Sequence, residues 1–194
     1  MKGCRPLSDE EITVVSRSFG GTYAARDRAL FILGLKSGFR ISELLSLRVG
    51  DVLQHDRLVD QVTVRRAHMK QRTEGRTVPL HPEAKQALAA WIDALRDGGR
   101  CSATTYLFRS RQGGNRPITR IQAWQILTEA YRTNELTGKL GTHAMRKTFA
   151  TKVYTRLQHD LVKTQRALGH RNINSTVSYL SFCEDDVRQA ILAL

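Results

Sequence analysis

His143 and Arg146 lie three positions apart in a segment with a helical pattern. That spacing places both side chains on one face of a helix. A guanidinium can give a phosphate two parallel N–H bonds, and an imidazole can move a proton near neutral pH. The pair is therefore suited to phosphate chemistry, although an ordinary basic helix on a protein surface would place the same two residue types together.

Arg40 follows a glycine at the point where one helix is expected to end and the next to begin, and Glu43 comes three residues later. One interpretation is a surface ion pair within a helix, which contributes a few tenths of a kcal/mol. The other is that the carboxylate fixes the arginine so that its guanidinium faces a phosphate. These residues by themselves leave both interpretations open.

His170 and Tyr179 are nine residues apart near the end of the chain. Gly169 is expected to end one helix, and Asn172 or Asn174 to cap the next. We expect a histidine in such a turn to be exposed and aimed by the backbone. A tyrosine near the end of a short helix is ordinarily a half-buried core residue, but its hydroxyl could also act as a nucleophile.

Transfer of a phosphodiester requires a nucleophile, cationic donors around the non-bridging oxygens and an acid for the leaving oxygen. The sequence offers no acidic cluster of the kind that holds magnesium. Cationic side chains would then have to take the place of a metal. We therefore expect neither a metal ion nor another cofactor.

Charge and composition restrict the class of partner. Lysine and arginine number 31 against 18 acidic residues, which gives a formal net charge of +13. Such a surplus favours an anionic partner, most often nucleic acid, with RNA or an acidic membrane surface as alternatives. Three widely spaced cysteines without a CxxC motif predict neither a disulfide framework nor a zinc site, and favour a cytoplasmic protein. No apolar run approaches the ~20 residues of a membrane span, so we expect no membrane association.

The elements that must position these residues follow from the spacing of apolar side chains and from capping signals. Two strands, Gln61–Arg65 and Arg76–Leu80, are expected to form a hairpin around the polar segment Met69–Gly75. Helices are expected at 9–18, 22–37, 41–47, 82–96, 118–131, 142–158, 160–168, 174–182 and 184–193. The predicted fold class is mainly α with a small antiparallel β-sheet (α+β).

The motifs together resemble the tyrosine recombinase (phage integrase) family. The segments 38–47, 143–146 and 168–170, followed by Tyr179, occur in the order and with the spacing of that family's two catalytic boxes. The resemblance runs from about Leu7 to the end. It implies the family's catalytic-domain fold over residues 1–194, as a single domain. It also implies a site-specific recombinase that cleaves and rejoins DNA through a 3′-phosphotyrosine intermediate without a metal.

The resemblance implies a role for each matching residue. Arg40 and Arg146 match the two arginines that grip the non-bridging oxygens of the scissile phosphate. His143 matches the histidine that manages the nucleophile's proton and binds the phosphate. His170 matches a position that supports the phosphate and the packing around it. Tyr179 matches the nucleophile.

The family also has a catalytic lysine in a β-hairpin loop, which protonates the leaving 5′ oxygen. Lys70 matches it, because it lies between the two expected strands, with Arg72 close by. Glu43 matches an acidic position that supports the site without being catalytic. Lys147 stands where many relatives carry a second histidine.

The resemblance further implies double-stranded DNA as partner and a tetramer on paired DNA sites. Because the apolar stripe of the last helix is short and should hold subunits together only weakly without DNA, we expect a monomer in free solution. The apolar stripe of the terminal helix, about 184–194, would either pack on its own domain or dock in trans on a neighbouring protomer. Most relatives carry an additional N-terminal helical domain. The chain is then either a fragment of a longer integrase or one of the short recombinases, cytoplasmic and encoded by a prokaryote, phage or plasmid.

Three other classes of protein explain some of these residues. A non-enzymatic helix-turn-helix protein would explain the segment from Leu161 to Leu180 and the charge, but it leaves Arg40 and the His143 and Arg146 pair as coincidences. A relaxase-type endonuclease would need two histidines flanking an apolar residue, and the sequence has no such pair. A type IB topoisomerase would use the same catalytic set, and only the family resemblance separates it from a recombinase.

Overall fold

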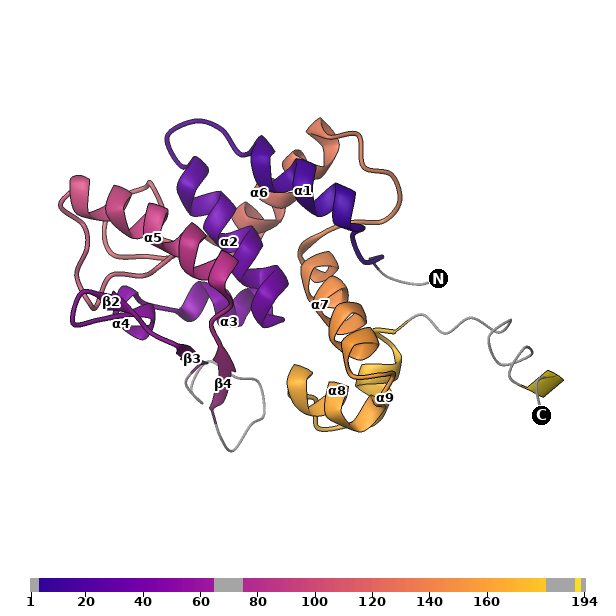
Figure 1. Cartoon of the computed structure of the whole chain (residues 1–194). Coiled ribbons are helices and arrows are strands. Elements are labelled where there is room, and N and C mark those ends of the chain that lie inside the picture. The colour runs from indigo at the N-terminus through magenta and orange to yellow at the C-terminus, as the bar shows by residue number, and fades with distance from the viewer. Residues whose placement is uncertain (1–3, 65–74, 181–190, 193–194) are drawn as a thin grey trace. The chain divides into compact units, whose positions relative to one another are not determined.

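The computed structural model describes residues 4–64, 75–180 and 191–192 (Figure 1). The chain divides into two compact units, Met1–Phe149 and Ala150–Leu194. Within the described residues, no helix is long and apolar enough to cross a membrane. The expectation of one catalytic domain over the whole chain stays a prediction.

The first unit holds most of the helices and all the described strands. Its elements are α1 (Asp9–Ser18), α2 (Ala24–Ser37), α3 (Ile41–Ser46), α4 (Val49–Val52), β1 (Leu53–Gln54), β2 (Arg57–Leu58), β3 (Gln61–Val64), β4 (Arg76–Pro79), α5 (Pro82–Asp97) and α6 (Arg120–Thr133). Helix α7 (Thr142–Arg156) begins in this unit and continues into the second, which adds α8 (Leu161–Leu168) and α9 (Ile173–Val177). The predicted fold class is confirmed.

The part of the chain that the structure describes forms two small antiparallel sheets, β1–β2 and β3–β4. In the second, Val62 pairs with Val78 and Val64 with Arg76, and buried and exposed positions alternate along both strands. The first sheet and α4 were missed by the sequence prediction. The turn between β1 and β2 uses His55 and Asp56 at positive φ, without the glycine that usually marks such a turn.

Other boundaries agree with the predicted ones to within a few residues, apart from α9. The prediction extended this helix to residue 182, whereas the structure ends it at Val177. The loop between β3 and β4, with Lys70 and Arg72, lies outside the described residues. So does almost all of the predicted terminal helix 184–193.

Helix α2 forms the centre of the first unit and packs against α5 (Figure 1). Leu30, Phe31 and Leu33 on α2 are at most 1% exposed. The helix ends at Gly38, whose φ of 59° is left-handed. A Cβ there would lie 2.3 Å from a ring carbon of Phe149, so both the conformation and the space require glycine. This glycine sets the direction in which the chain leaves α2 towards Arg40.

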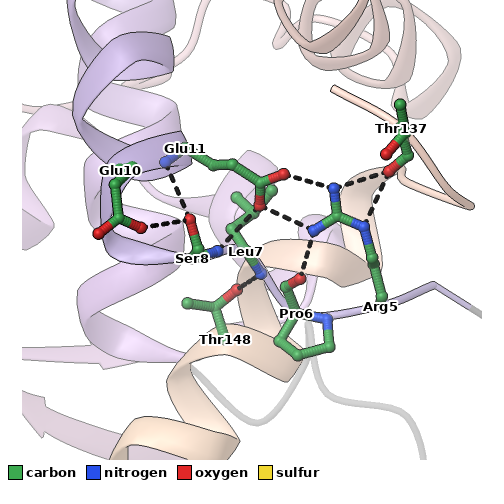
Figure 2. A network of polar contacts seen from close by, with 8 residues as sticks. All are labelled: Arg5, Pro6, Leu7, Ser8, Glu10, Glu11, Thr137 and Thr148. Carbon is green, nitrogen blue, oxygen red and sulfur yellow. Dashed lines mark hydrogen bonds and ion pairs between the residues drawn. The ribbon is translucent and has the colours of Figure 1, made fainter. Parts of the chain in front are cut away.

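The first residues of the described chain are tied to the segment that leads into α7 (Figure 2). The guanidinium of Arg5 donates to the Glu11 carboxylate at 2.7 and 2.5 Å, and to the carbonyl of Thr137 at 2.8 and 2.6 Å. The backbone N–H of Leu7 donates to Oγ1 of Thr148 on α7 at 2.8 Å. Glu11 also completes the predicted capping box with Ser8. The N-terminal segment therefore helps to hold α7.

Candidate active site

Arg40 stands at the start of α3, and a buried carboxylate holds it there. Its backbone N–H donates to Oε2 of Glu43 at 2.7 Å, and its Nη1 donates to Oε1 at 3.0 Å. The Glu43 side chain is 2% exposed, whereas that of Arg40 is 39% exposed. The pair is therefore not a surface ion pair. A buried carboxylate supports an arginine whose guanidinium still reaches solvent, as the second interpretation of this motif expected.

Arg146 reaches the same turn from α7. It is 1% exposed, and its Nη1 donates to the carbonyl of Gly38, two residues before Arg40. His143 lies one helical turn earlier on α7 and is exposed. The positive charges of Arg146 and Arg40 both lower the pKa of His143, so the two guanidiniums lie close enough to act on its imidazole. The structure thus brings together three of the six predicted site residues.

Arg76 is a member of this cluster that the sequence analysis did not select. It is 6% exposed and donates to the carbonyls of Ser37 and Gly38, and its Nη1 lies 4.0 Å from Oε2 of Glu43. A signal was present in the sequence: the alternation along β4 places Arg76 on the same inward face as Val78. An arginine on the buried face of a strand needs a partner for its charge, so the sequence pattern could have identified Arg76 as a candidate site residue.

Among the described residues of this turn, positive charges outnumber negative ones. Arg40, Arg76 and Arg146 carry three positive charges, and Glu43 carries one negative charge. Because these side chains are largely shielded from water, their excess positive charge attracts an anion more strongly than it would in water. The exposed side of the cluster is therefore suited to bind an anion with two free oxygens, such as a phosphodiester.

The pKa of His143 is lowered from its usual value of 6.5, first by partial loss of solvent and then by the charges of Arg146, Arg40 and Lys147. We expect its imidazole to titrate below 6.5 in an NMR pH titration of the free protein. Lys147→Ala should raise the midpoint, because it removes one repelling charge. A midpoint at or above 6.5 in the unmodified protein would contradict this environment.

The same shift makes stability depend on pH. Between the unfolded-state pKa of about 6.5 and the lower folded-state pKa, the unfolded chain binds more protons than the folded one. The contribution of His143 to the free energy of unfolding is therefore present above 6.5 and is lost as the pH falls through that window. The His143→Asn variant should lack this contribution in urea denaturation curves measured across the window.

His170 and Tyr179 lie together in the second unit. Helix α8 ends at Gly169 with a left-handed φ of 64°, and Asn172 caps α9, as predicted. The expectation that His170 is exposed was wrong, because the side chain is buried. Its Nδ1 lies 3.0 Å from Oγ1 of Thr176, and this hydrogen bond turns the ring inward.

The ring of Tyr179 meets the ring of His170 edge-on, with 5.2 Å between the centroids. Tyr179 follows α9 and is partly exposed. Such an arrangement fixes the direction of the tyrosine ring while solvent still reaches the side chain. Two further predicted site residues therefore lie side by side in this unit. Lys70, the sixth, is outside the described residues.

Comparison with known proteins places the chain in a family. The profile of the phage integrase family matches residues 10–183. The probable integrase/recombinase YoeC of Bacillus subtilis is 34% identical over 165 residues, which cover 85% of this chain and 82% of YoeC. Tyrosine recombinase XerC of Bacillus pumilus is 31% identical over 172 residues, which cover 87% of this chain and 53% of XerC.

A solved structure shares the fold. The XerH site-specific recombinase bound to difH substrate superposes with a TM-score of 0.73 at 22% identity, covering 98% of this chain and 55% of XerH. The chain therefore spans about half the length of XerC and XerH. These matches confirm the predicted family, fold class and functional class. The chain belongs to the phage integrase family, as a tyrosine-type site-specific recombinase with the catalytic-domain fold.

Proposed function

We propose that this chain cleaves one strand of double-stranded DNA with the hydroxyl of Tyr179 and then rejoins it to another strand. The phenolic oxygen attacks the phosphorus, the bond to the 5′ oxygen breaks, and that oxygen leaves as a hydroxyl after taking a proton. The phosphate stays on the tyrosine at the 3′ end. Rejoining is the reverse attack by a 5′ hydroxyl, so no external energy source is needed.

The observation that carries this proposal is the convergence of Arg40 and Arg146 on the turn at Gly38, beside His143. Two guanidiniums can each donate to a non-bridging oxygen and stabilise the charge that develops there. His143 has a lowered pKa and is therefore mostly neutral near pH 7, so that it can accept a proton. We assign it the proton of the Tyr179 hydroxyl.

The remaining roles in this proposal belong to His170 and Lys70. His170 packs against the ring of Tyr179 and directs it. Lys70, in the loop between β3 and β4, supplies the proton to the leaving 5′ oxygen, a role that rests on the family resemblance. The net charge of +13 supports DNA as partner, as does the Tn1549 transposon integrase, a structural neighbour solved in complex with transposon right end DNA. A cytoplasmic location fits a DNA partner and stays a prediction.

The proposal is tested with nicked duplexes whose sequences are randomised on both sides of the nick. When a nick lies just beyond the scissile phosphate, cleavage releases a short fragment that carries the 5′ hydroxyl. This fragment diffuses away, so the covalent adduct accumulates and is seen on a denaturing gel. We expect adducts with a shared sequence around the attached phosphate. The yield in excess EDTA should equal that with magnesium, because Arg40, Arg146, His143 and Lys70 supply the positive charge.

Three outcomes would count against this mechanism. Binding of the duplexes without any adduct would favour the non-enzymatic DNA-binding alternative. Loss of cleavage in EDTA that magnesium restores would indicate a metal-dependent nuclease. An adduct on a residue other than Tyr179, found by peptide mapping, would remove that residue from the role of nucleophile.

We further propose that the protein is a monomer in free solution and a tetramer on paired DNA sites, linked by the segment after Cys183. Its apolar residues Val187, Ala190, Ile191 and Leu194 follow helical spacing, which suits docking on a neighbouring protomer. Deleting the segment should impair recombination more than single-site cleavage. Light scattering of the protein with and without paired DNA sites measures whether it is a monomer or a tetramer. Loss of a cooperative thermal transition after the deletion would instead identify the segment as part of its own domain's core.

A further inference from the structure

Arg76 lies at the start of β4 and points to the interior of the first unit. It pairs with Val64 of β3, and its side chain is 5% exposed. Its Cζ lies 5.1 Å from the centre of the Phe39 ring, a cation–π contact. Taking a guanidinium out of water is costly unless its charge and its N–H groups find partners. The partners described for Arg76 include two backbone carbonyls where α2 ends and a carboxylate at the start of α3.

Two of these partners are backbone carbonyls at the end of α2. Nη2 of Arg76 donates to the carbonyl of Ser37 at 2.9 Å, and Nη1 donates to that of Gly38 at 3.2 Å. The last carbonyls of a helix lack partners within it and carry partial negative charge. One planar guanidinium thus binds two consecutive carbonyls. Because Arg146 donates to the Gly38 carbonyl as well, a single oxygen joins Arg76 to Arg146.

The third partner is the carboxylate of Glu43. Nη1 of Arg76 lies 4.0 Å from Oε2, the same oxygen that accepts the backbone N–H of Arg40. Glu43 therefore stands between an exposed arginine and a buried one. The buried charge of Arg76 attracts the carboxylate and helps to hold it in place, and the carboxylate in turn fixes the direction of Arg40.

We propose that Arg76 is a positioning residue for the phosphate site: it fixes the turn Ser37–Arg40 so that Arg40 and Arg146 reach the scissile phosphate together. The inference rests on the proposed strand cleavage and adds to it a buried arginine that touches no DNA. Its role depends on the forked shape of the guanidinium, because a lysine ammonium cannot bind both carbonyls in the same fixed geometry. Arg76→Lys therefore keeps the charge and loses the geometry.

The test compares Arg76→Lys with Arg26→Lys as a matched control. Arg26 is also 6% exposed, lies near the other end of α2 and makes contacts of the same kinds. It forms an ion pair with Asp27, donates to one backbone carbonyl and lies over the ring of Tyr23. Both variants lose a buried forked donor. Only the first is next to the phosphate site, so a loss caused by general destabilisation should appear in both.

Cleavage is measured on the nicked duplex that the unmodified protein selects, with an ordinary scissile phosphate and with a methylphosphonate there. On the phosphodiester, Arg76→Lys should react about 100-fold more slowly at saturating DNA, as expected for small misplacement of catalytic groups. Its apparent Kd for DNA should change little. The methylphosphonate lacks the negative charge that the arginines bind, so on it the defect should be about tenfold smaller. Arg26→Lys should match the unmodified protein on both.

A second readout needs no DNA. The Nη1–H signal of Arg40, the group that donates to Glu43, should be resolved in a low-temperature NMR spectrum of the free protein, and should broaden in Arg76→Lys but not in Arg26→Lys. If Arg76→Lys fails to fold, a double variant with Arg76→Met and Glu43→Gln takes its place, because it removes both charges of the buried ion pair. This double variant is compared with Glu43→Gln alone. The double variant should then show the same selective loss on the phosphodiester.

Equal losses on the two substrates, or a rate for Arg76→Lys equal to that of the unmodified protein, would overturn the positioning role. An Arg40 signal that does not respond to Arg76→Lys would do so as well. If the unmodified protein forms no adduct on any duplex, the proposed strand cleavage fails. The NMR comparison still decides whether Arg76 orders Arg40, so the two failures are distinguishable.

Discussion

Tyr179→Phe should abolish covalent attachment to DNA while leaving DNA affinity within a few-fold of the unmodified protein. Phenylalanine keeps the ring and therefore the edge-on contact with His170, so the packing of this turn should survive. Only the phenolic oxygen is lost, and without it no bond to phosphorus can form. Adduct yield on nicked duplexes and a binding titration measure the two effects separately.

Tyr154→Phe is the matched control for this substitution. Tyr154 also lies against a histidine ring, with 4.9 Å between its centroid and that of His159. Removing its hydroxyl is the same chemical change beside the same kind of neighbour, and the adduct yield should not fall. If Tyr179→Phe still forms an adduct, or if both variants lose it equally, Tyr179 is not the nucleophile.

Of all these substitutions, Glu43→Ala should lower the free energy of unfolding the most. The substitution leaves the buried guanidinium of Arg76 without its carboxylate and removes the acceptor for the backbone N–H of Arg40. Breaking a buried pair by removing one partner typically costs about 3–5 kcal/mol. We expect a decrease of that size in the free energy of unfolding, measured in urea, together with loss of cleavage.

Glu129→Ala provides the comparison on the surface. Glu129 pairs with Arg132 at the same sequence separation of three, but its side chain is 61% exposed. Exposed pairs contribute about 0.2–1 kcal/mol, so this variant should unfold almost like the parent protein. A loss below about 1 kcal/mol for Glu43→Ala would mean that the buried carboxylate is not an essential part of this turn.

The elements around the site were predictable where a local signal exists. Ser8 and Glu11 predicted the capping box of α1. Gly38 predicted the end of α2, because glycine readily adopts the left-handed conformation found there. Where the signal was weak, the prediction failed. The turn at His55 and Asp56 has positive φ angles without a glycine or asparagine, so the β1–β2 hairpin was missed.

The site itself depends on contacts between residues far apart in the chain. Arg146 donates to the carbonyl of Gly38, 108 residues earlier in the chain. The spacing of apolar residues predicts helices and strands, but it does not predict a hydrogen bond between residues so far apart. Only the family resemblance related Arg40 to Arg146 beforehand. His170 shows the same limit at shorter range. The turn was identified correctly, but the direction of the ring depends on Thr176, six residues later.

The attachment of the N-terminal segment has a mechanical consequence. Arg5 and Leu7 bind the carbonyl of Thr137 and the side chain of Thr148, which flank the start of the helix that carries His143 and Arg146 (Figure 2). A pull applied ahead of Arg5, by a tag, a surface tether or any fused polypeptide, is therefore transmitted first to this helix. A force measurement made through that end would therefore report on α7, which carries two of the proposed phosphate-binding residues, before the central α2–α5 pair.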